Sequence, residues 1–212
     1  MELPNNIIKH YLKNVFFISG SACGGKTTIA KRLSAKYKIT LYNWDERFSQ
    51  HKVISDPIHQ PFMNKEWASW EERFNLQPTD QSISNSILEQ AKISIIELLT
   101  ISQEQPIIAE GIFNCNILEK ISDRNKVVFL MADMQAVRTD FFFRTDKLDM
   151  LQCIETLKDP ELAKENTFQA IEYNLKREIE SVKKSGFWYH IRGISPDWER
   201  ITEAVERQLE LS

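Results

Sequence analysis

Residues 20–27 carry the pattern with the clearest chemical meaning in this sequence. They read Gly-Ser-Ala-Cys-Gly-Gly-Lys-Thr and fit the phosphate-binding loop pattern G-x-x-x-x-G-K-[ST] with no mismatch. Glycines let backbone N–H groups approach an anion closely, and the N-terminus of a following helix adds partial positive charge. The residues expected to contact a nucleotide here are Gly20, Ser21, Ala22, Cys23, Gly24, Gly25, Lys26, Thr27 and Thr28.

Two side chains of this loop have distinct expected roles. Lys26 is placed to reach the β- and γ-phosphates of a nucleotide, and the Thr27 hydroxyl is placed to bind Mg²⁺. The flanking sequence provides the context that the motif requires, because an apolar run at 15–18 precedes the loop and a helix-forming run at 28–33 follows it. A chance glycine-rich turn with a lysine is therefore the weaker interpretation.

The composition of the chain limits the classes of partner that it is expected to bind. The 212 residues have a formal net charge of −3 and no basic run, which argues against a nucleic-acid or membrane-surface partner. No stretch has the apolar length of a membrane span, and residues 1–6 lack the features of a signal peptide. Three cysteines without metal-binding spacing indicate reduced thiols. We expect a cytoplasmic protein.

Strands and helices alternate along the chain, which favours a parallel sheet covered by helices on both faces. A helix at 64–74 would place Trp67, Trp70 and Phe74 on one face. The closing helix is expected to have Pro196 at its first position. Strands are expected at 14–19, 39–42, 107–109, 126–131 and 187–191, and helices at 26–36, 64–74, 79–102, 134–143, 159–184 and from 195 onward.

With its glycine loop after the first strand, the chain resembles the P-loop kinases of small molecules. These include nucleoside and nucleotide kinases, gluconate kinase, shikimate kinase and chloramphenicol phosphotransferase. Residues 107–112 are similar to the strand ending in Glu-Gly-Ile of uridine-kinase-like proteins, and residues 191–197 to the adenine-side loop. The resemblance implies one P-loop NTP hydrolase domain over 1–212, sheet order 2-3-1-4-5, a substrate-side helical insertion at about 46–78 and a lid at about 138–158. ATP and Mg²⁺ are the implied cofactors.

Acidic residues follow two of the expected strands, where ligands bind in open α/β sheets. By resemblance, Asp45 holds the acceptor hydroxyl or takes its proton, although it is also placed to cap a short helix from Glu46. By the same resemblance, Glu110 is expected to face the Mg²⁺ site through water, with an ion pair to a neighbouring base as the alternative. Asp133 is a second candidate for the metal, and either Asp45 or Glu110 is the base.

Three arginines are candidate site residues, two for the transferred phosphoryl group and one for binding ATP. By resemblance, Arg138 and Arg144 belong to the lid and close over the transferred phosphoryl group, to which guanidinium is well matched. The region lacks the dense arginines of nucleotide kinases, so Arg138 is equally well interpreted as a solvated helix residue. Arg192 belongs to the segment that resembles the adenine-side loop.

Trp67, Trp70, Arg73 and Phe74 lie in the expected insertion, which closes over the acceptor in nucleotide kinases. The aromatic rings either stack on a planar acceptor or form a face packed against the core, and the spacing favours core packing. In the first interpretation, Arg73 holds an anionic group of the acceptor.

The function that these features favour is ATP-dependent phosphotransfer to a hydroxyl or phosphate of a small molecule, with nucleosides and nucleotides among the candidates. The alternative is an ATP-binding or ATP-hydrolysing protein without an acceptor. A GTPase-type switch is disfavoured because the sequence contains no Asp-x-x-Gly, and its nearest match to a guanine-reading motif, residues 146–149, follows a helix instead of a strand. The acceptor and the oligomeric state are not indicated.

Overall fold

The structure is a computed structural model that describes residues 4–211, so residues 1–3 and 212, including half of the N-terminal segment considered above, lie outside the described residues. Within 4–211, five strands form one parallel sheet in the order β2-β3-β1-β4-β5. This confirms the α/β fold class and the expected 2-3-1-4-5 order. The strands are β1 (Val15–Ser19), β2 (Thr40–Asn43), β3 (Ile107–Glu110), β4 (Val127–Ala132) and β5 (Trp188–Arg192).

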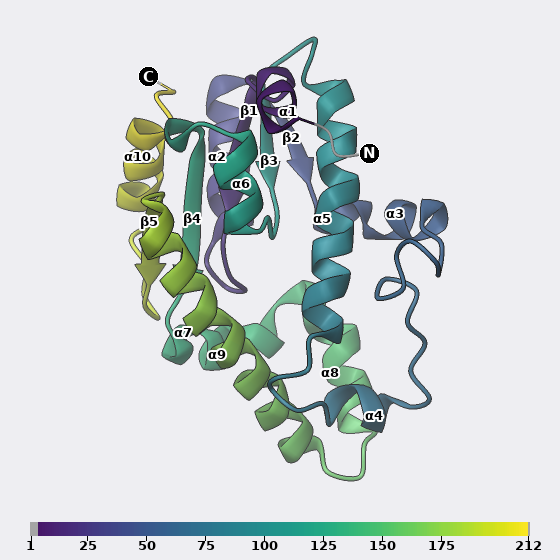
Figure 1. Ribbon diagram of the computed structural model, residues 1–212. Helices are drawn as coiled ribbons and strands as arrows, with labels where there is room; N and C mark the ends of the chain where they lie inside the picture. Colours follow the sequence, from purple (N-terminus) through teal and green to yellow (C-terminus); the bar gives the residue numbers. More distant parts are fainter. Residues whose placement is uncertain (1–3, 212) are drawn as a thin grey trace.

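Helices cover both faces of the sheet, which gives three layers (Figure 1). Alternate side chains of a strand point to opposite faces, so Phe17 of β1 joins one apolar core and Ile18 joins the other. The helices α2 (Lys26–Tyr37) and α10 (Trp198–Gln208) cover the Ile18 face, while α5 (Ser82–Ile101), α6 (Cys115–Ile121) and α9 (Pro160–Ser185) cover the Phe17 face.

The central strands are buried on both sides, as their continuous apolar runs predict. The parallel register pairs Ile18 with Glu110 and Ser19 with Phe129. The carboxyl ends of β1, β3 and β4 therefore meet at one edge of the sheet, where ligands bind in this kind of fold.

The long helix α9 has both ends close to their predicted positions. The Asp159 side chain caps α9, and Gly186 ends it in the left-handed conformation at φ 72°. The prediction for the closing helix was wrong in one detail. Asp197 caps α10 and the helix begins at Trp198, so Pro196 precedes the cap and does not occupy the first helical position.

The predicted helix over 64–74 is also wrong. Only α4 (Trp70–Phe74) is helical in this stretch, and the Ser69 side chain caps it by accepting from the Glu72 N–H. Trp67 precedes the helix, so the three aromatic residues share no helical face: Phe74 is buried, whereas Trp70 is 46% exposed. The region also contains α3 (Phe48–Ile54), which follows a 3-10 turn at 45–47; a short helix from Glu46 was considered only as the alternative role for Asp45. The helices α1 (Asn5–Tyr11) and α6 were not predicted.

After β4, the chain leaves the sheet in short helical segments. The helix α7 (Met134–Asp140) ends before the phenylalanine run, which continues as a 3-10 turn over 141–143, and α8 (Leu148–Glu155) follows a second such turn. Phe141, Phe142 and Phe168 pack in a separate apolar cluster with parts of α7 and α9. In the described part of the chain, every helix is too short or too polar to cross a membrane.

Candidate active site

The loop between β1 and α2 takes a conformation that depends on its glycines. Gly20 and Gly25 have φ of 127° and 89°, in the range that favours glycine. A Cβ atom on Gly20 or Gly24 would lie 2.0 Å from the Leu130 carbonyl oxygen of β4, and one on Gly25 would meet the Trp198 ring at 2.3 Å. The loop is therefore held directly against the central strand and the start of α10, with no room for larger residues at these positions.

Protein groups hold the loop in place at two further points. The Lys26 ammonium donates to the Ser21 carbonyl at 2.7 Å, which folds the lysine back over the loop. The Ser21 hydroxyl accepts from the Ala132 N–H at 3.2 Å. All nine loop residues predicted to contact a nucleotide line one cavity: Gly20, Ser21, Ala22, Cys23, Gly24, Gly25, Lys26, Thr27 and Thr28.

Glu110 and Thr27 meet at the foot of this cavity. The Thr27 hydroxyl donates to Glu110 Oε1 at 3.0 Å, while Glu110 Oε2 is buried with no hydrogen-bond partner among the described residues. Burial raises the pKa of Glu110, and the nearby Lys26 opposes this shift. A hydroxyl beside an unsatisfied carboxylate oxygen is a hard oxygen set of the kind that Mg²⁺ takes alongside its waters. These residues therefore fit a magnesium ion.

Asp45 lies at the rim of the same cavity, exposed, in the 3-10 turn after β2. The Asn43 side chain caps this turn by accepting from the Asp45 N–H at 3.1 Å. The Asp45 carboxylate has no hydrogen-bond or ion-pair partner within residues 4–211, and it is close enough to Glu110 to contribute to the raised pKa of that group. A free carboxylate near Thr27 and Glu110 is placed to hold a hydroxyl.

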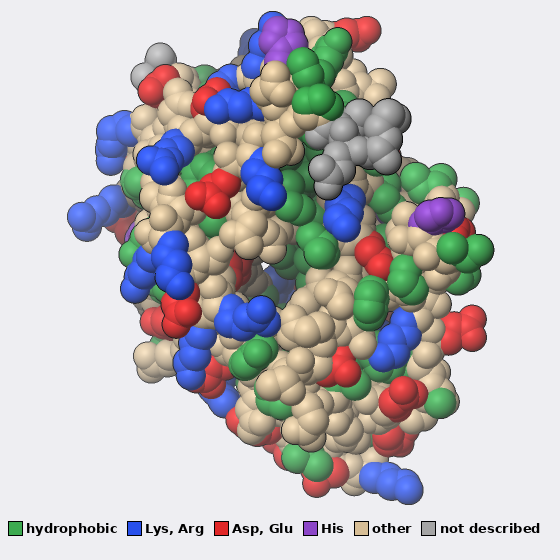
Figure 2. Space-filling model, viewed as in Figure 1, with side chains coloured by type: hydrophobic (Ala, Val, Ile, Leu, Met, Phe, Trp, Pro, Cys, Tyr) green, Lys and Arg blue, Asp and Glu red, His purple; other side chains and the backbone are tan. Residues whose placement is uncertain are grey.

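The cavity that these residues line has a volume of about 1260 Å³. It extends from the loop past Asp45 into the space between α5, α6 and α9. Figure 2 shows a hollow near the middle of one face, between α9 and α5. Single drug-sized ligands occupy roughly 300–1,000 Å³. The cavity thus has room for more than one small molecule.

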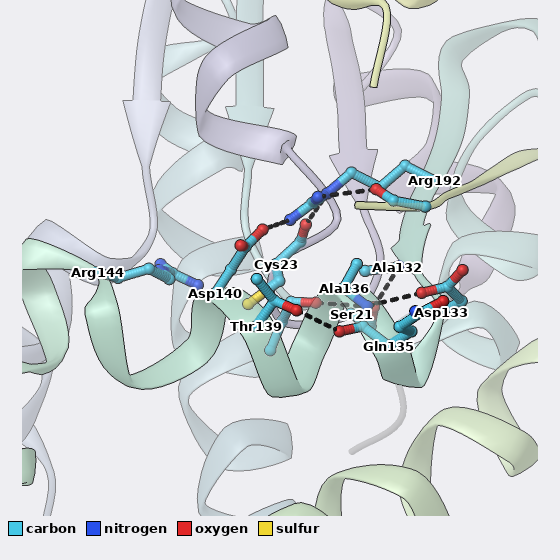
Figure 3. Close-up of polar contacts among 12 residues, drawn as sticks. Ser21, Cys23, Ala132, Asp133, Gln135, Ala136, Thr139, Asp140, Arg144 and Arg192 are labelled. Atoms are coloured by element: carbon cyan, nitrogen blue, oxygen red, sulfur yellow. Dashed lines mark hydrogen bonds and ion pairs between the residues drawn. The ribbon is translucent and has the colours of Figure 1, made fainter. Parts of the chain in front are cut away.

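Arg192 braces the phosphate loop from the end of β5. Its guanidinium donates to the Cys23 carbonyl at 2.5 Å, to Asp140 at 2.5 Å and to the Gly193 carbonyl at 3.0 Å (Figure 3). The side chain is 5% exposed. Because Arg192 directs these donors to Cys23 and Asp140, it connects the loop to α7. The centre of the Trp198 ring lies 5.7 Å from its guanidinium carbon.

The two arginines expected in a lid have different surroundings. Arg144 is half-buried, lines the cavity, and makes a two-bond ion pair with Asp146 at 2.9 Å. The helix predicted over 134–143 ends at Asp140, and Arg144 lies in extended backbone between two 3-10 turns. Arg138 is bound by both carboxylate oxygens of Glu165 on the exposed side of α7 and is not among the residues that line the cavity. Of these two arginines, the structure places Arg144 in the cavity of the phosphate loop and Arg138 outside it.

Asp133, the second candidate for the metal, caps α7 by accepting from the Ala136 N–H at 2.7 Å (Figure 3). It does not line the cavity.

In the expected insertion, Trp67, Arg73 and Phe74 line the cavity, whereas Trp70 does not. The Arg73 guanidinium lies 5.4 Å from the Trp70 ring and has no ion-pair or hydrogen-bond partner in the described chain, and burial lowers its pKa.

Sequence reasoning missed two cavity residues. Asp140 holds Arg192, and Glu178 of α9 lines the same cavity as the loop. Glu178 is detectable in principle, because it is a charged residue at a position of α9 where the helical period places apolar side chains. The helix is highly charged overall, so this signal is hard to see before the packing is known.

No protein-family model matches the chain, and no curated protein matches it in sequence. Its structure is similar to that of shikimate kinase from Acinetobacter baumannii in complex with shikimate, at 14% identity and a TM-score of 0.54, over 98% of this chain and 97% of that chain. It is also similar to shikimate kinase from Bacteroides thetaiotaomicron, at 16% identity and a TM-score of 0.51, over 92% and 98%. At these identities the likeness establishes the fold alone, and this is the fold expected from the sequence.

Proposed function

We propose that this protein is a kinase that transfers a phosphoryl group from ATP to a small-molecule acceptor. The observation that carries the proposal is the single cavity of about 1260 Å³ that joins the phosphate loop to a chamber with unpaired charged side chains. A protein that only hydrolyses ATP needs no such second compartment. A cytoplasmic location, where ATP and Mg²⁺ are abundant, is part of the proposal.

In this proposal, the loop N–H groups and Lys26 bind the nucleotide phosphates, and the Thr27 hydroxyl and Glu110 hold Mg²⁺. Lys26 exchanges its bond to the Ser21 carbonyl for a phosphate oxygen. When bound, Mg²⁺ supplies positive charge to the phosphate oxygens. The tight packing of Gly20 and Gly24 against β4 supports this role, since it orients the loop without movement at the moment of transfer.

The acceptor occupies the chamber beyond the loop. Asp45 holds its hydroxyl and takes the proton as transfer proceeds, because its carboxylate is free and lies near the magnesium ligands. Arg73, a half-buried cation without a counter-ion in the described chain, binds an anionic group of the acceptor. The segment 46–78 is therefore proposed as the acceptor side of the site.

Arg144 binds the transferred phosphoryl group, and the segment 138–158 is proposed as the lid. The ion pair with Asp146 holds the guanidinium half-buried beside the loop. A guanidinium near Cys23 is well placed for charge that spreads over the phosphoryl oxygens in the transition state. Arg138 has no part in this proposal, because its partner is Glu165.

A screen of small-molecule acceptors for stimulated ADP release tests the proposal. We expect sugars, polyols, nucleosides or small hydroxy acids to increase ADP release by the wild-type protein, and Lys26→Ala to lose both basal and stimulated release, since Lys26 is the cation of the loop. ADP release that depends on Lys26 but responds to no acceptor would instead support ATP hydrolysis alone. Unchanged ATP affinity and release in Lys26→Ala would overturn the phosphate-loop assignment itself.

A further inference from the structure

The helix α9 turns a stripe of apolar side chains toward the protein interior. Phe168, Leu175 and Val182 recur every seven residues on this stripe and are buried, and Ile171 packs beside them. Glu178 lies on the same stripe, three residues after Leu175 and four before Val182. An apolar residue at this position would extend the core, whereas a carboxylate there loses hydration.

Glu178 makes no hydrogen bond or ion pair with any residue in the described range 4–211. Its neighbours along the helix are all engaged. Asn174, one turn before it, accepts from the Ser84 hydroxyl of α5 at 3.2 Å. Ser181, nearly one turn after it, donates to the Asn116 side chain of α6 at 3.4 Å. The polar groups around Glu178 thus connect α9 to α5 and α6, while its own carboxyl is left without a partner.

Glu178 is among the residues that line the cavity containing the phosphate loop. Its side chain is half-buried, on the stripe of α9 that faces the protein interior. Burial raises the pKa of Glu178 to about 7, and the nearby Lys26 partly offsets the effect. An unpaired carboxyl with a raised pKa, close to the loop lysine, is a feature of ligand sites more often than of cores.

We propose that Glu178 is an acceptor-binding residue whose carboxyl takes a hydrogen bond from a hydroxyl or amino group of the acceptor. The proposal rests on the kinase function proposed above and specifies the acceptor further. The acceptor carries a hydrogen-bond donor that points toward α9, in addition to the group that is phosphorylated. The apolar stripe is interrupted at this position because binding needs a polar group there, and the fold is less stable as a result.

The test compares wild-type protein with Glu178→Gln and with Glu180→Gln as the matched control. Glu180 is on the same helix two residues away, is exposed, and does not line the cavity. Three quantities are measured at pH 8: the melting temperature, the affinity for MgATP, and acceptor-stimulated ADP release. The acceptor probes are matched sets that differ in one group, such as glucose, glucosamine and 2-deoxyglucose, together with nucleosides and their deoxy analogues.

We expect Glu178→Gln to melt about 2–8 °C higher than Glu180→Gln, because it removes an ionised buried carboxyl. MgATP affinity should stay within about threefold of wild type. The kcat/KM for an active acceptor should fall by about tenfold to a hundredfold, the size expected for losing one charged hydrogen bond. The analogue that lacks the donor should be insensitive to the substitution, and the hydroxyl and amino members of each set identify which donor is bound.

A lower melting temperature in Glu178→Gln than in the control would show a structural role and overturn the proposal. The proposal would also be overturned if an active acceptor had the same kcat/KM with both variants. In that case the kinase function would stand. If no probe stimulates the wild-type protein, the kinase proposal fails, and the acceptor role of Glu178 fails with it.

Discussion

The substitution Gly24→Ala tests the geometry on which the candidate active site depends. The added Cβ would lie 2.0 Å from the Leu130 carbonyl oxygen and 2.6 Å from its carbon. Leu130 is fully buried in β4, which is paired on both sides by β1 and β5, so this backbone has little freedom to move. The loop must therefore shift away from the strand by about 1.4 Å or more to reach an ordinary contact distance, which begins at 3.4 Å.

This shift has consequences for stability and for binding. Overpacking a rigid site costs about 1–3 kcal/mol, and for a domain of this size each kcal/mol lowers the melting temperature by about 2–4 °C. We therefore expect a fall of about 2–12 °C in Gly24→Ala. A displacement of about 1 Å in groups that position a reacting phosphate reduces turnover by about a hundredfold, and MgATP binding should weaken as well.

Gly193→Ala provides the control for Gly24→Ala. The nearest atom to a Cβ at Gly193 is Asp133 Oδ2 at 3.6 Å, an ordinary contact, and Gly193 has no left-handed φ. The control should keep its melting temperature within about 2 °C of wild type. Differential scanning calorimetry and titration calorimetry with MgATP measure both quantities. Wild-type stability and affinity in Gly24→Ala would refute the close packing of the loop on β4.

Three other perturbations separate the roles assigned above. Arg144→Ala should lower kcat by about tenfold or more, with a smaller effect on the KM for ATP. The control Arg138→Ala breaks only the exposed pair with Glu165 and should match wild type. Equal effects of the two substitutions in steady-state assays would contradict the lid assignment. Asp45→Asn should keep MgATP affinity and lose transfer by about a hundredfold to ten-thousandfold, and rates within about twofold of wild type would exclude Asp45 as the base. The pKa of Glu178 is raised from 4.5 to about 7 in the folded protein, so the folded state holds an extra proton between these values and wild-type stability falls as pH rises through this window. Because water in the cavity screens the carboxylate, we expect the free energy of unfolding to fall by about 1–2 kcal/mol across this window. Urea unfolding at several pH values should show this fall in the wild-type protein and not in Glu178→Gln.

The sequence alone determined the parts of this protein that depend on local rules. The loop at 20–27 was predicted because its residue types are required by backbone geometry and phosphate chemistry, and the structure confirms its strand–loop–helix setting. The buried strands β1, β3 and β4 followed from short, continuous apolar runs. The sheet order came from the resemblance to P-loop kinases, since the spacing of strands along a chain does not specify which strands are neighbours.

The tertiary structure decided which charged side chains reach the cavity. Arg138 and Arg144 are six residues apart and chemically identical, yet one pairs with Glu165 outside and the other lies beside the loop, because the helix ends at Asp140 and the chain turns. Local patterns also failed at 64–74, where a cap at Ser69 limits the helix to five residues. Glu178 becomes meaningful only once α5, α6 and α9 enclose it, since a carboxylate on an apolar stripe has no defined surroundings until the neighbouring helices are in place.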